Sequence, residues 1–291
     1  MANELGFIGL GVMGGPMARN LSKEHTVVGF DTQAARFEGL PRVKHAQTAA
    51  EVAQRCRVVF LSLPSAAIVE SVILGPDGLI HHLSAGSLVL DLSTGLPAVS
   101  RQIAARLAEK GIDYADVPVS GGEAGAQAGT LALMAGASEA VFDRARPYLK
   151  PLGSVVRAGD IGAGNVAKLV NNMIVGVTFA VIAEGFAVAV GNGLDPALLH
   201  SAIQGGWAGS KVLDVSAPAI AAGEYKPGGT IDMIQKDLGY AALLADESEV
   251  ETPMTAAARE LFAAAQAAGW GAQSQPALFR LWERSSDRRE S

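Results

Sequence analysis

A glycine-rich segment near the start of the chain has the spacing of a loop that holds a dinucleotide. Gly9, Leu10, Gly11, Val12, Met13 and Gly14 form a G-x-G-x-x-G motif between an apolar run and a helix-like segment. In such a loop Gly9 suits a tight turn, Gly11 lets backbone approach a pyrophosphate, and Gly14 lets the helix pack closely on the strand. The order of strand, motif and helix favours dinucleotide binding over an ordinary glycine-rich turn.

Asp31 decides which dinucleotide this loop prefers. It follows the second apolar run, about twenty residues after the motif, where a carboxylate accepts the ribose hydroxyls and repels a 2′-phosphate. Thr32 and Gln33 come next, so no adjacent arginine is available to bind that phosphate. We therefore expect NAD as the cofactor, with NADP as the alternative if Arg36 reaches the site.

Three further loops each follow an apolar run and carry polar or glycine residues. Leu63 and Pro64 end one run, Thr94 follows another, and Ser120, Gly121 and Gly122 follow a third. Because ligands of parallel sheets bind at the carboxyl ends of the strands, the first two loops are expected to line the cofactor site. Consecutive glycine N–H groups and a serine hydroxyl suit a substrate carboxylate. Ordinary turn chemistry is the alternative for each loop.

Lys168 and Asn172 are four residues apart in an otherwise apolar helical segment, and so share one helix face. Desolvation there would lower the lysine pKa toward the range of a general acid/base. The alternative is a lysine that reaches solvent from a helix start. Lys236, beside Asp237, is either a second site lysine or part of a surface ion pair. The five histidines lack ligand spacing, so no metal site is expected.

Periodicity then indicates the elements that position these residues. Strands are expected at Leu5–Gly9, Thr26–Phe30, Val58–Leu63, Leu88–Leu92 and Asp113–Val117, and edge strands at Leu131–Met134 and Ser154–Arg157. Beyond Gly159 only helices are expected, at Val166–Val190, Pro196–Gln204, Ile231–Asp246 and Pro253–Ala268. This pattern predicts an α/β fold with a doubly wound, Rossmann-type parallel sheet, followed by an all-α domain with a long central helix. The expected domains are 1–161, which binds NAD, and 162–291, which binds substrate and forms oligomers.

Composition excludes several classes of protein. The 291 residues include 23 basic and 29 acidic ones, a net charge of −6 that disfavours binding to nucleic acid or anionic membranes. The single cysteine, Cys56, excludes an internal disulfide and favours a reducing, cytoplasmic location. The first residues lack the basic n-region of a signal peptide. Met173–Val190 is apolar apart from Glu184, and a helix buried on all sides, within the protein or an oligomer, explains it better than a membrane span.

Taken together, these motifs resemble the β-hydroxyacid dehydrogenase family over nearly the whole chain. The resemblance rests on Gly6–Ala18, Asp116–Gly122, Gly129–Leu131, Gly164–Asn172 and Lys236–Leu238. It implies that Lys168 is the catalytic acid/base, that Ser120, Gly121 and Gly122 hold the substrate, and that Asn172 orients it. It also implies that the Gly9–Gly14 loop, Thr94 and Lys236 contact the cofactor or the closed site, and that the all-α domain forms a homodimer or homotetramer.

The expected function is hydride transfer between NAD(H) and a small β-hydroxy acid or its semialdehyde. Gly205–Asp214 and Gly159–Val166 are most similar to reductases of tartronate semialdehyde, which form glycerate, and Trp207, Lys211 and Asn172 offer donors to a polar substrate. The Asn171–Asn172 pair is closer to dehydrogenases of 3-hydroxyisobutyrate, the alternative, with threonate a further one. A dinucleotide-binding sensor without turnover is the alternative from another class, but it requires neither Lys168 nor Ser120–Gly122.

Overall fold

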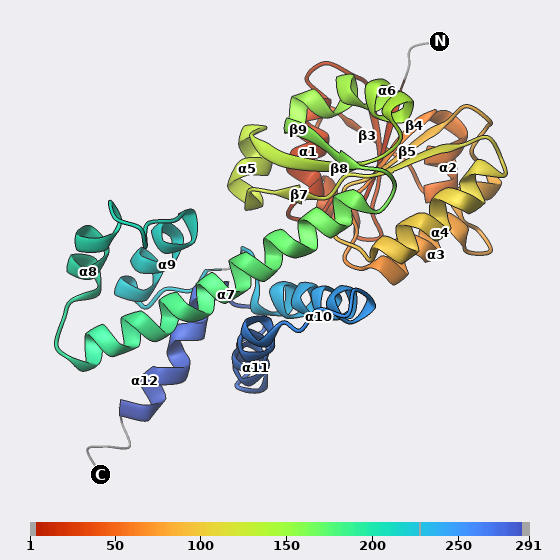
Figure 1. The fold of residues 1–291 in the computed structure, drawn as a ribbon. Helices are drawn as coiled ribbons and strands as arrows, with labels where there is room; N and C mark the ends of the chain where they lie inside the picture. The colour runs from red at the N-terminus through yellow and green to blue at the C-terminus, as the bar shows by residue number, and fades with distance from the viewer. Residues whose placement is uncertain (1–3, 227, 287–291) are drawn as a thin grey trace. The chain divides into compact units, whose positions relative to one another are not determined.

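The computed structural model describes residues 4–226 and 228–286 (Figure 1). The chain forms two compact units that divide between Lys168 and Leu169. This division lies seven residues beyond the expected boundary after residue 161. Helix α7 (Ala163–Gly191) begins in the first unit because its start is hydrogen-bonded to the end of a strand there.

The first unit is built on one sheet of parallel strands with an antiparallel segment near one edge. The strand order is β3-β2-β1-β4-β5-β6-β8-β7, and β9 pairs with β8. β1 to β6 are parallel in their pairings, as are β8 and β9, whereas β8 runs antiparallel to β6 and β7. The strands are β1 (Leu5–Ile8), β2 (Val27–Phe30), β3 (Val43–His45), β4 (Val58–Leu61), β5 (Leu88–Asp91), β6 (Asp113–Asp116), β7 (Val119–Ser120), β8 (Leu131–Gly136) and β9 (Gly153–Gly159).

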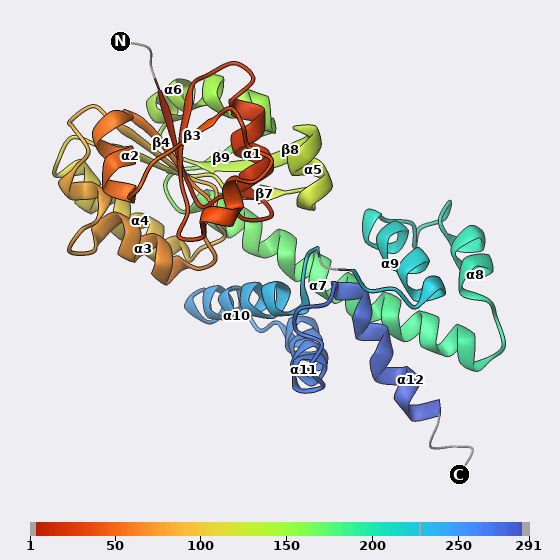
Figure 2. The ribbon, with the colours of Figure 1, turned by 180° about the vertical axis from the view of Figure 1, so that it is seen from behind.

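The central strands β1, β4 and β5 are buried along their whole length, as expected for parallel strands with apolar sequences that are covered on both faces. Phe7 and Phe60 stack in the core on one face, whereas Ile8 and Val59 point into the core on the other. The first face is covered by α1 (Gly14–Leu21), α5 (Gly122–Ala128) and α6 (Glu139–Leu149) (Figure 2). The second is covered by α2 (Ala49–Arg55), α3 (Ala66–Leu74) and α4 (Pro97–Ala108). The doubly wound α/β fold is therefore confirmed.

The second unit is helical. Besides the rest of α7 it contains α8 (Pro196–Ile203), α9 (Lys211–Ala222), α10 (Ile231–Glu247), α11 (Pro253–Ala267) and α12 (Arg280–Ser286). Phe186 of α7, Leu238 of α10 and Phe262 of α11 lie in its core. The helix α9, which was not expected, begins at the N-cap Ser210 and contains Pro218. The short strands β3 and β7 also went unpredicted.

Helix α7 is long and apolar enough to cross a membrane by length and composition, but only 28% of its most apolar window is buried. Ile174, Val181 and Val188 are exposed at seven-residue intervals along it. The expectation of a helix buried on all sides is thus wrong for the single chain, because none of the helices described in this unit covers the stripe. Burial of the stripe in an oligomer stays a prediction.

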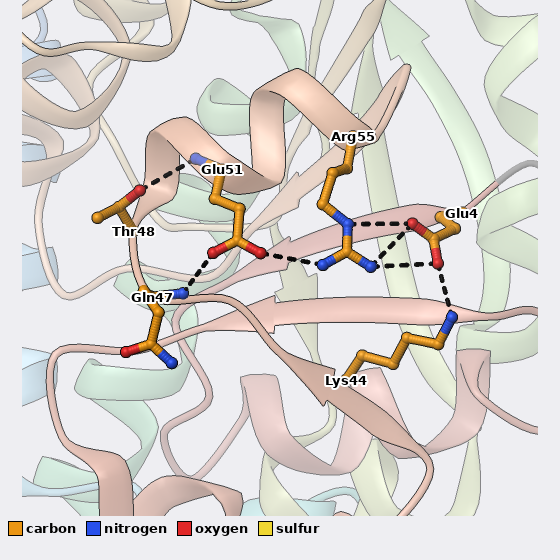
Figure 3. Close-up of polar contacts among 6 residues, drawn as sticks. All are labelled: Glu4, Lys44, Gln47, Thr48, Glu51 and Arg55. Atoms are coloured by element: carbon orange, nitrogen blue, oxygen red, sulfur yellow. Dashed lines mark hydrogen bonds and ion pairs between the residues drawn. The ribbon is translucent and has the colours of Figure 1, made fainter.

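An ion-pair network links the amino-terminal side of the sheet to a helix (Figure 3). Glu4, directly before β1, pairs with Lys44 of β3 at 2.8 Å and with Arg55 of α2 at 3.1 Å. Arg55 also pairs with Glu51, which lies in the first turn of α2 above the N-cap Thr48. The hydrogen bond from Lys44, and the neighbouring Arg55, lower the pKa of Glu4 against the effect of its partial burial. The network therefore stabilises the fold while Glu4 is ionised.

We predict that Glu4→Gln lowers the free energy of unfolding at pH 7 by about 0.5–1 kcal/mol, because the network loses its central charge. A carboxyl whose pKa is lowered by folding stabilises the protein above its unfolded pKa, and this stabilisation is lost as the pH falls through the folded pKa. The difference from the native protein should consequently shrink toward zero in acid. Urea unfolding of the native protein and the variant, at pH 7 and at a pH below the folded pKa of Glu4, measures this difference in stability.

The control is Glu24→Gln, since Glu24 is exposed and forms no ion pair with the described residues. The role of the network would be contradicted if Glu4→Gln lost the same free energy of unfolding at neutral and acid pH. An equal loss of stability in Glu24→Gln would also contradict it.

Candidate active site

The loop between β1 and α1 has the geometry that its glycines predict. Gly9 has φ of +91°, in the region that favours glycine. A Cβ atom on Gly14 would overlap the carbonyl oxygen of Gly9, so the first turn of α1 packs directly on the loop. At Gly11 a Cβ would meet nothing within 4 Å. The backbone at Gly11 is therefore open to a ligand. Gly9 and Gly14, in contrast, are required for the conformation and packing of the loop itself.

Asp31 holds this loop from the end of β2. Its Oδ2 accepts a hydrogen bond from the N–H of Leu10 at 2.7 Å, and its Oδ1 accepts one from the N–H of Gln33 at 2.9 Å. The side chain is half-buried, while Thr32 and Arg36 are exposed. Each carboxylate oxygen has a further lone pair for a ribose hydroxyl. The open backbone at Gly11 beside this carboxylate fits the pyrophosphate and ribose of NAD.

Buried hydrogen bonds join the ends of β4, β5 and β6. The N–H of Leu63 donates to Ser93 Oγ at 2.9 Å, and the N–H of Ser93 donates to Asp91 Oδ1 at 3.0 Å. Tyr114 Oη donates to Asp91 Oδ2 at 3.1 Å. Burial raises the pKa of Asp91 to about 6, against the hydrogen bonds from Ser93 and Tyr114. Thr94, next to Ser93, is consequently held at the carboxyl edge of the sheet.

Asp116, the last residue of β6, holds the start of α7. Its Oδ1 accepts from the N–H of Gly162 at 2.7 Å, and its Oδ2 accepts from the N–H of Asn165 at 2.8 Å. These are among the N–H groups that a helix cannot pair internally at its start. Burial raises the pKa of Asp116 to about 7, while the two N–H donors oppose that shift.

Lys168 lies three residues after Asn165, in the turn of α7 that follows the one held by Asp116. Its side chain is half-buried, between the exposed Val166 and the buried Leu169 on the helix surface. The lysine therefore has the partly desolvated setting expected of an acid/base, on a helix start whose position is fixed by the strand ends.

The predicted carboxylate-binding segment lies at the end of the antiparallel strand β7, where Val119 and Ser120 pair with β8. Gly121 and Gly122 follow with φ of +134° and +62°, both unfavourable for other residues. Ser120 is half-buried and the two glycines are exposed. The backbone of this segment is thus accessible, and only glycine adopts it without strain.

The second unit joins two residues that were predicted separately. Asn172 Nδ2 donates to Asp237 Oδ2 at 2.7 Å, and Lys236 Nζ lies 2.9 Å from Asp237 Oδ1. Lys236 also lies over the ring of Tyr240, 5.1 Å from its centroid. The ion pair considered for Lys236 and Asp237 is therefore present, but its carboxylate is buried rather than at the surface. The carboxylate couples the amide of Asn172 to the ammonium of Lys236.

Most of the predicted site residues therefore lie in the first unit. Lys168 lies in the second turn of α7, and the others lie at or after the ends of strands: Gly9–Gly14, Asp31, Leu63, the exposed Pro64, Thr94 and Ser120–Gly122. Asn172 and Lys236 belong to the second unit. Sequence reasoning missed the roles of Asp91, Asp116 and Asn165. A carboxylate that ends an otherwise apolar strand was the signal available for Asp91, whereas the strand that Asp116 ends also begins with an aspartate.

Two family models match consecutive parts of the chain. Residues 4–163 match the NAD binding domain of 6-phosphogluconate dehydrogenase. Residues 162–282 match the NAD-binding domain of NADP-dependent 3-hydroxyisobutyrate dehydrogenase. Between them these models cover both units that the structure describes.

Three relatives match along most of the chain. A 2-(hydroxymethyl)glutarate dehydrogenase of Eubacterium barkeri is 39% identical, over 96% of this chain and 95% of its own. A 3-hydroxyisobutyrate dehydrogenase of Pseudomonas aeruginosa is 40% identical, over 89% and 91%. A 2-hydroxy-3-oxopropionate reductase of Escherichia coli is 34% identical, over 96% and 97%. The chain belongs to the β-hydroxyacid dehydrogenase family. It is an NAD-dependent dehydrogenase of that family, and the predicted resemblance is confirmed.

A solved structure of this family agrees with the fold. The crystal structure of a 3-hydroxyisobutyrate dehydrogenase from Salmonella typhimurium has a TM-score of 0.89 at 29% identity, covering 96% of this chain and 99% of that one. The Rossmann-type sheet and helical unit described above are therefore those of a β-hydroxyacid dehydrogenase.

We predict different outcomes for alanine at two glycines of the cofactor loop. Gly14→Ala should lower the free energy of unfolding of the cofactor-free enzyme by about 1–3 kcal/mol, because the methyl overlaps backbone. Gly11→Ala should leave that stability within about 0.5 kcal/mol, since the methyl enters open space. It should instead weaken NADH binding. Chemical unfolding and NADH fluorescence titration measure the two effects. Native NADH affinity in Gly11→Ala, or native stability in Gly14→Ala, would contradict the assignment.

Proposed function

We propose that this β-hydroxyacid dehydrogenase interconverts tartronate semialdehyde and glycerate with NAD(H), and that Lys168 is its acid/base. The observation that carries the proposal is the position of Lys168 on the helix start that Asp116 holds at the end of β6. The end of β6 lies at the carboxyl edge of the sheet. The Gly9–Gly14 loop and Asp31, which fit the cofactor, follow the strands β1 and β2 at this same edge.

Each residue of the site has a distinct task in this mechanism. The bound nicotinamide cofactor supplies or accepts the hydride. Ser120 and the accessible backbone of Gly121 and Gly122 bind the substrate carboxylate. Lys168 donates a proton to the carbonyl oxygen as it becomes an alkoxide during reduction, and in the reverse direction it removes the hydroxyl proton. Asn172, whose amide is held by Asp237, orients the substrate.

The substrate class follows from what the named compounds of the three relatives share. Each has a terminal alcohol or aldehyde carbon attached to the carbon that bears a carboxylate. They differ in the remaining group on that carbon, which is a hydroxyl, a methyl or a carboxyethyl group. A single acid/base and carboxylate site therefore serves all three, and the remaining group determines which one is preferred.

The side-chain amide of Asn172 favours glycerate, the substrate whose remaining group is a hydroxyl. The Asn172 amide donates one N–H to Asp237, and we assign its second N–H to a substrate oxygen. Trp207 and Lys211, the other donors that the sequence offers, are exposed. Glycerate is consequently our first choice, and it is the product of the reductase that is 34% identical. The second choice, 3-hydroxyisobutyrate, is favoured by the higher identity of 40% to a dehydrogenase of that compound.

We predict that Lys168→Ala lowers kcat by about 10²–10⁴-fold while the Kd for NADH stays near that of the native enzyme, because the lysine acts on the substrate oxygen. Steady-state kinetics and NADH titration measure both. Lys110→Ala is the matched control, since Lys110 is exposed in the turn that follows α4. Native turnover in Lys168→Ala would contradict the assignment.

We predict a higher kcat/KM with NAD⁺ than with NADP⁺, because the Asp31 carboxylate repels a 2′-phosphate. The double variant Asp31→Ser with Thr32→Arg should shift the preference toward NADP⁺. Thr32→Arg alone, which keeps the carboxylate, should shift it less. A native enzyme that prefers NADP⁺ would show that another residue, such as Arg36, binds the phosphate.

We predict a higher kcat/KM for D-glycerate than for 3-hydroxyisobutyrate with NAD⁺, because a buried N–H that binds the hydroxyl is left unpaired beside a methyl group. 3-Hydroxypropanoate, which has only hydrogen at this position, supplies the baseline. A preference of more than about tenfold for 3-hydroxyisobutyrate would show an apolar pocket and overturn our choice of substrate. It would leave the role of Lys168 intact.

A further inference from the structure

One buried side chain, Asn165, connects three elements around the start of α7. Its Oδ1 accepts from the N–H of Gly95, in the loop after β5, at 2.8 Å. Its Nδ2 donates to Ser100 Oγ on α4 at 3.0 Å. Its backbone N–H donates to Asp116 Oδ2, at the end of β6. With the side chain fully buried, Asn165 is thus bonded to the loop after β5, to α4 and to the end of β6.

Gly136 and Gly164 allow the start of α7 to pack directly against the sheet. A Cβ atom on Gly136 of β8 would overlap Asp116 Oδ1, and one on Gly164 would overlap the carbonyl oxygens of Asp116 and Met134. Backbone therefore meets backbone and carboxylate without intervening side chains. The first turn of α7 cannot move toward the sheet, and the bonds of Asn165 and Asp116 prevent it from moving away.

Asn165 is three residues before Lys168 on the same helix, so a displacement of Asn165 displaces Lys168 by a similar amount. The loop that Asn165 holds at Gly95 also carries Thr94, which is expected to contact the cofactor. We propose that Asn165, supported by Ser100 and Asp116, is the positioning residue that sets the distance of Lys168 from the Thr94 loop. This inference rests on the proposed role of Lys168.

A network of buried polar groups is a costly way to stabilise a fold. Replacing both partners of a buried hydrogen bond by apolar groups of similar shape is often neutral for stability. A fully paired network does, however, specify one arrangement of its members. Since a misplacement of about 1 Å costs a catalyst on the order of 10²-fold in rate, that arrangement has a direct effect on turnover.

The test compares two variants of the network, and the double variant that combines them, with one control. Ser100→Ala removes only the hydroxyl that supports Asn165, and Asn165→Ala removes the connection itself. The matched control is Ser87→Ala, because Ser87 is equally buried in the same unit and its hydroxyl has no partner among the described residues. For each variant, NADH titration counts the competent sites, kinetics give kcat per site and KM, and thermal unfolding gives the midpoint.

We expect kcat per NADH-binding site to fall about 10²-fold in Asn165→Ala and about tenfold in Ser100→Ala, with KM for the hydroxy acid changed less than about twofold. Ser87→Ala should keep the native kcat. The double variant Ser100→Ala with Asn165→Ala should have the same kcat per site as Asn165→Ala, because Ser100 acts through Asn165. A purely structural role would lower the number of sites and the midpoint while each remaining site kept its native kcat.

Native kcat per site in Ser100→Ala and in Asn165→Ala would overturn the inference. Should Asn165→Ala fail to fold, Ser100→Ala against Ser87→Ala decides the question alone. Lys168→Ala, measured in the same assay, separates the two proposals. If Lys168→Ala keeps full activity, the role of Lys168 itself is refuted. If Lys168→Ala loses activity while the Ser100 and Asn165 variants keep theirs, only the positioning role is refuted.

Discussion

The buried carboxylate of Asp116, paired with the first N–H groups of α7, is the interaction on which this site depends. An ionised carboxylate loses hydration when it is buried, and this cost raises the pKa of Asp116 to about 7. Two backbone N–H donors at a helix start offset part of that cost and in turn gain the partners that a helix cannot give them. The result is a helix that begins at one place on the sheet and carries Lys168 in its second turn.

The elements nearest to this interaction could be predicted because their signals are local. The Gly9–Gly14 loop is specified by glycine conformation and backbone approach, which act within six residues. The parallel strands are specified by short apolar runs between turns. Lys168 stood out because a cation within an apolar helix is costly unless it has a function. These features need no knowledge of residues far along the chain.

The contacts that hold the site together are not local, and no pattern in a single sequence indicates them. Asp116 and Asn165 are 49 positions apart, and Gly95 and Asn165 are 70 apart. Asn172 and Asp237 are 65 apart, which explains why Lys236–Asp237 resembled a surface ion pair. The sequence likewise did not show that part of α7 is exposed in the single chain, because apolar composition favours burial of a helix face without specifying the partner that covers it.

The most direct test of the account is a crystal structure of the enzyme with NAD⁺ and tartronate, whose second carboxylate replaces the aldehyde of tartronate semialdehyde. The account predicts that this carboxylate lies within about 2.6–3.2 Å of Lys168 Nζ, with the other carboxylate on Ser120 and the backbone of Gly121 and Gly122. Asp116 should still accept from Gly162 and Asn165. Tartronate bound beyond hydrogen-bonding reach of Lys168, with a different side chain on the reacting oxygen, would contradict it.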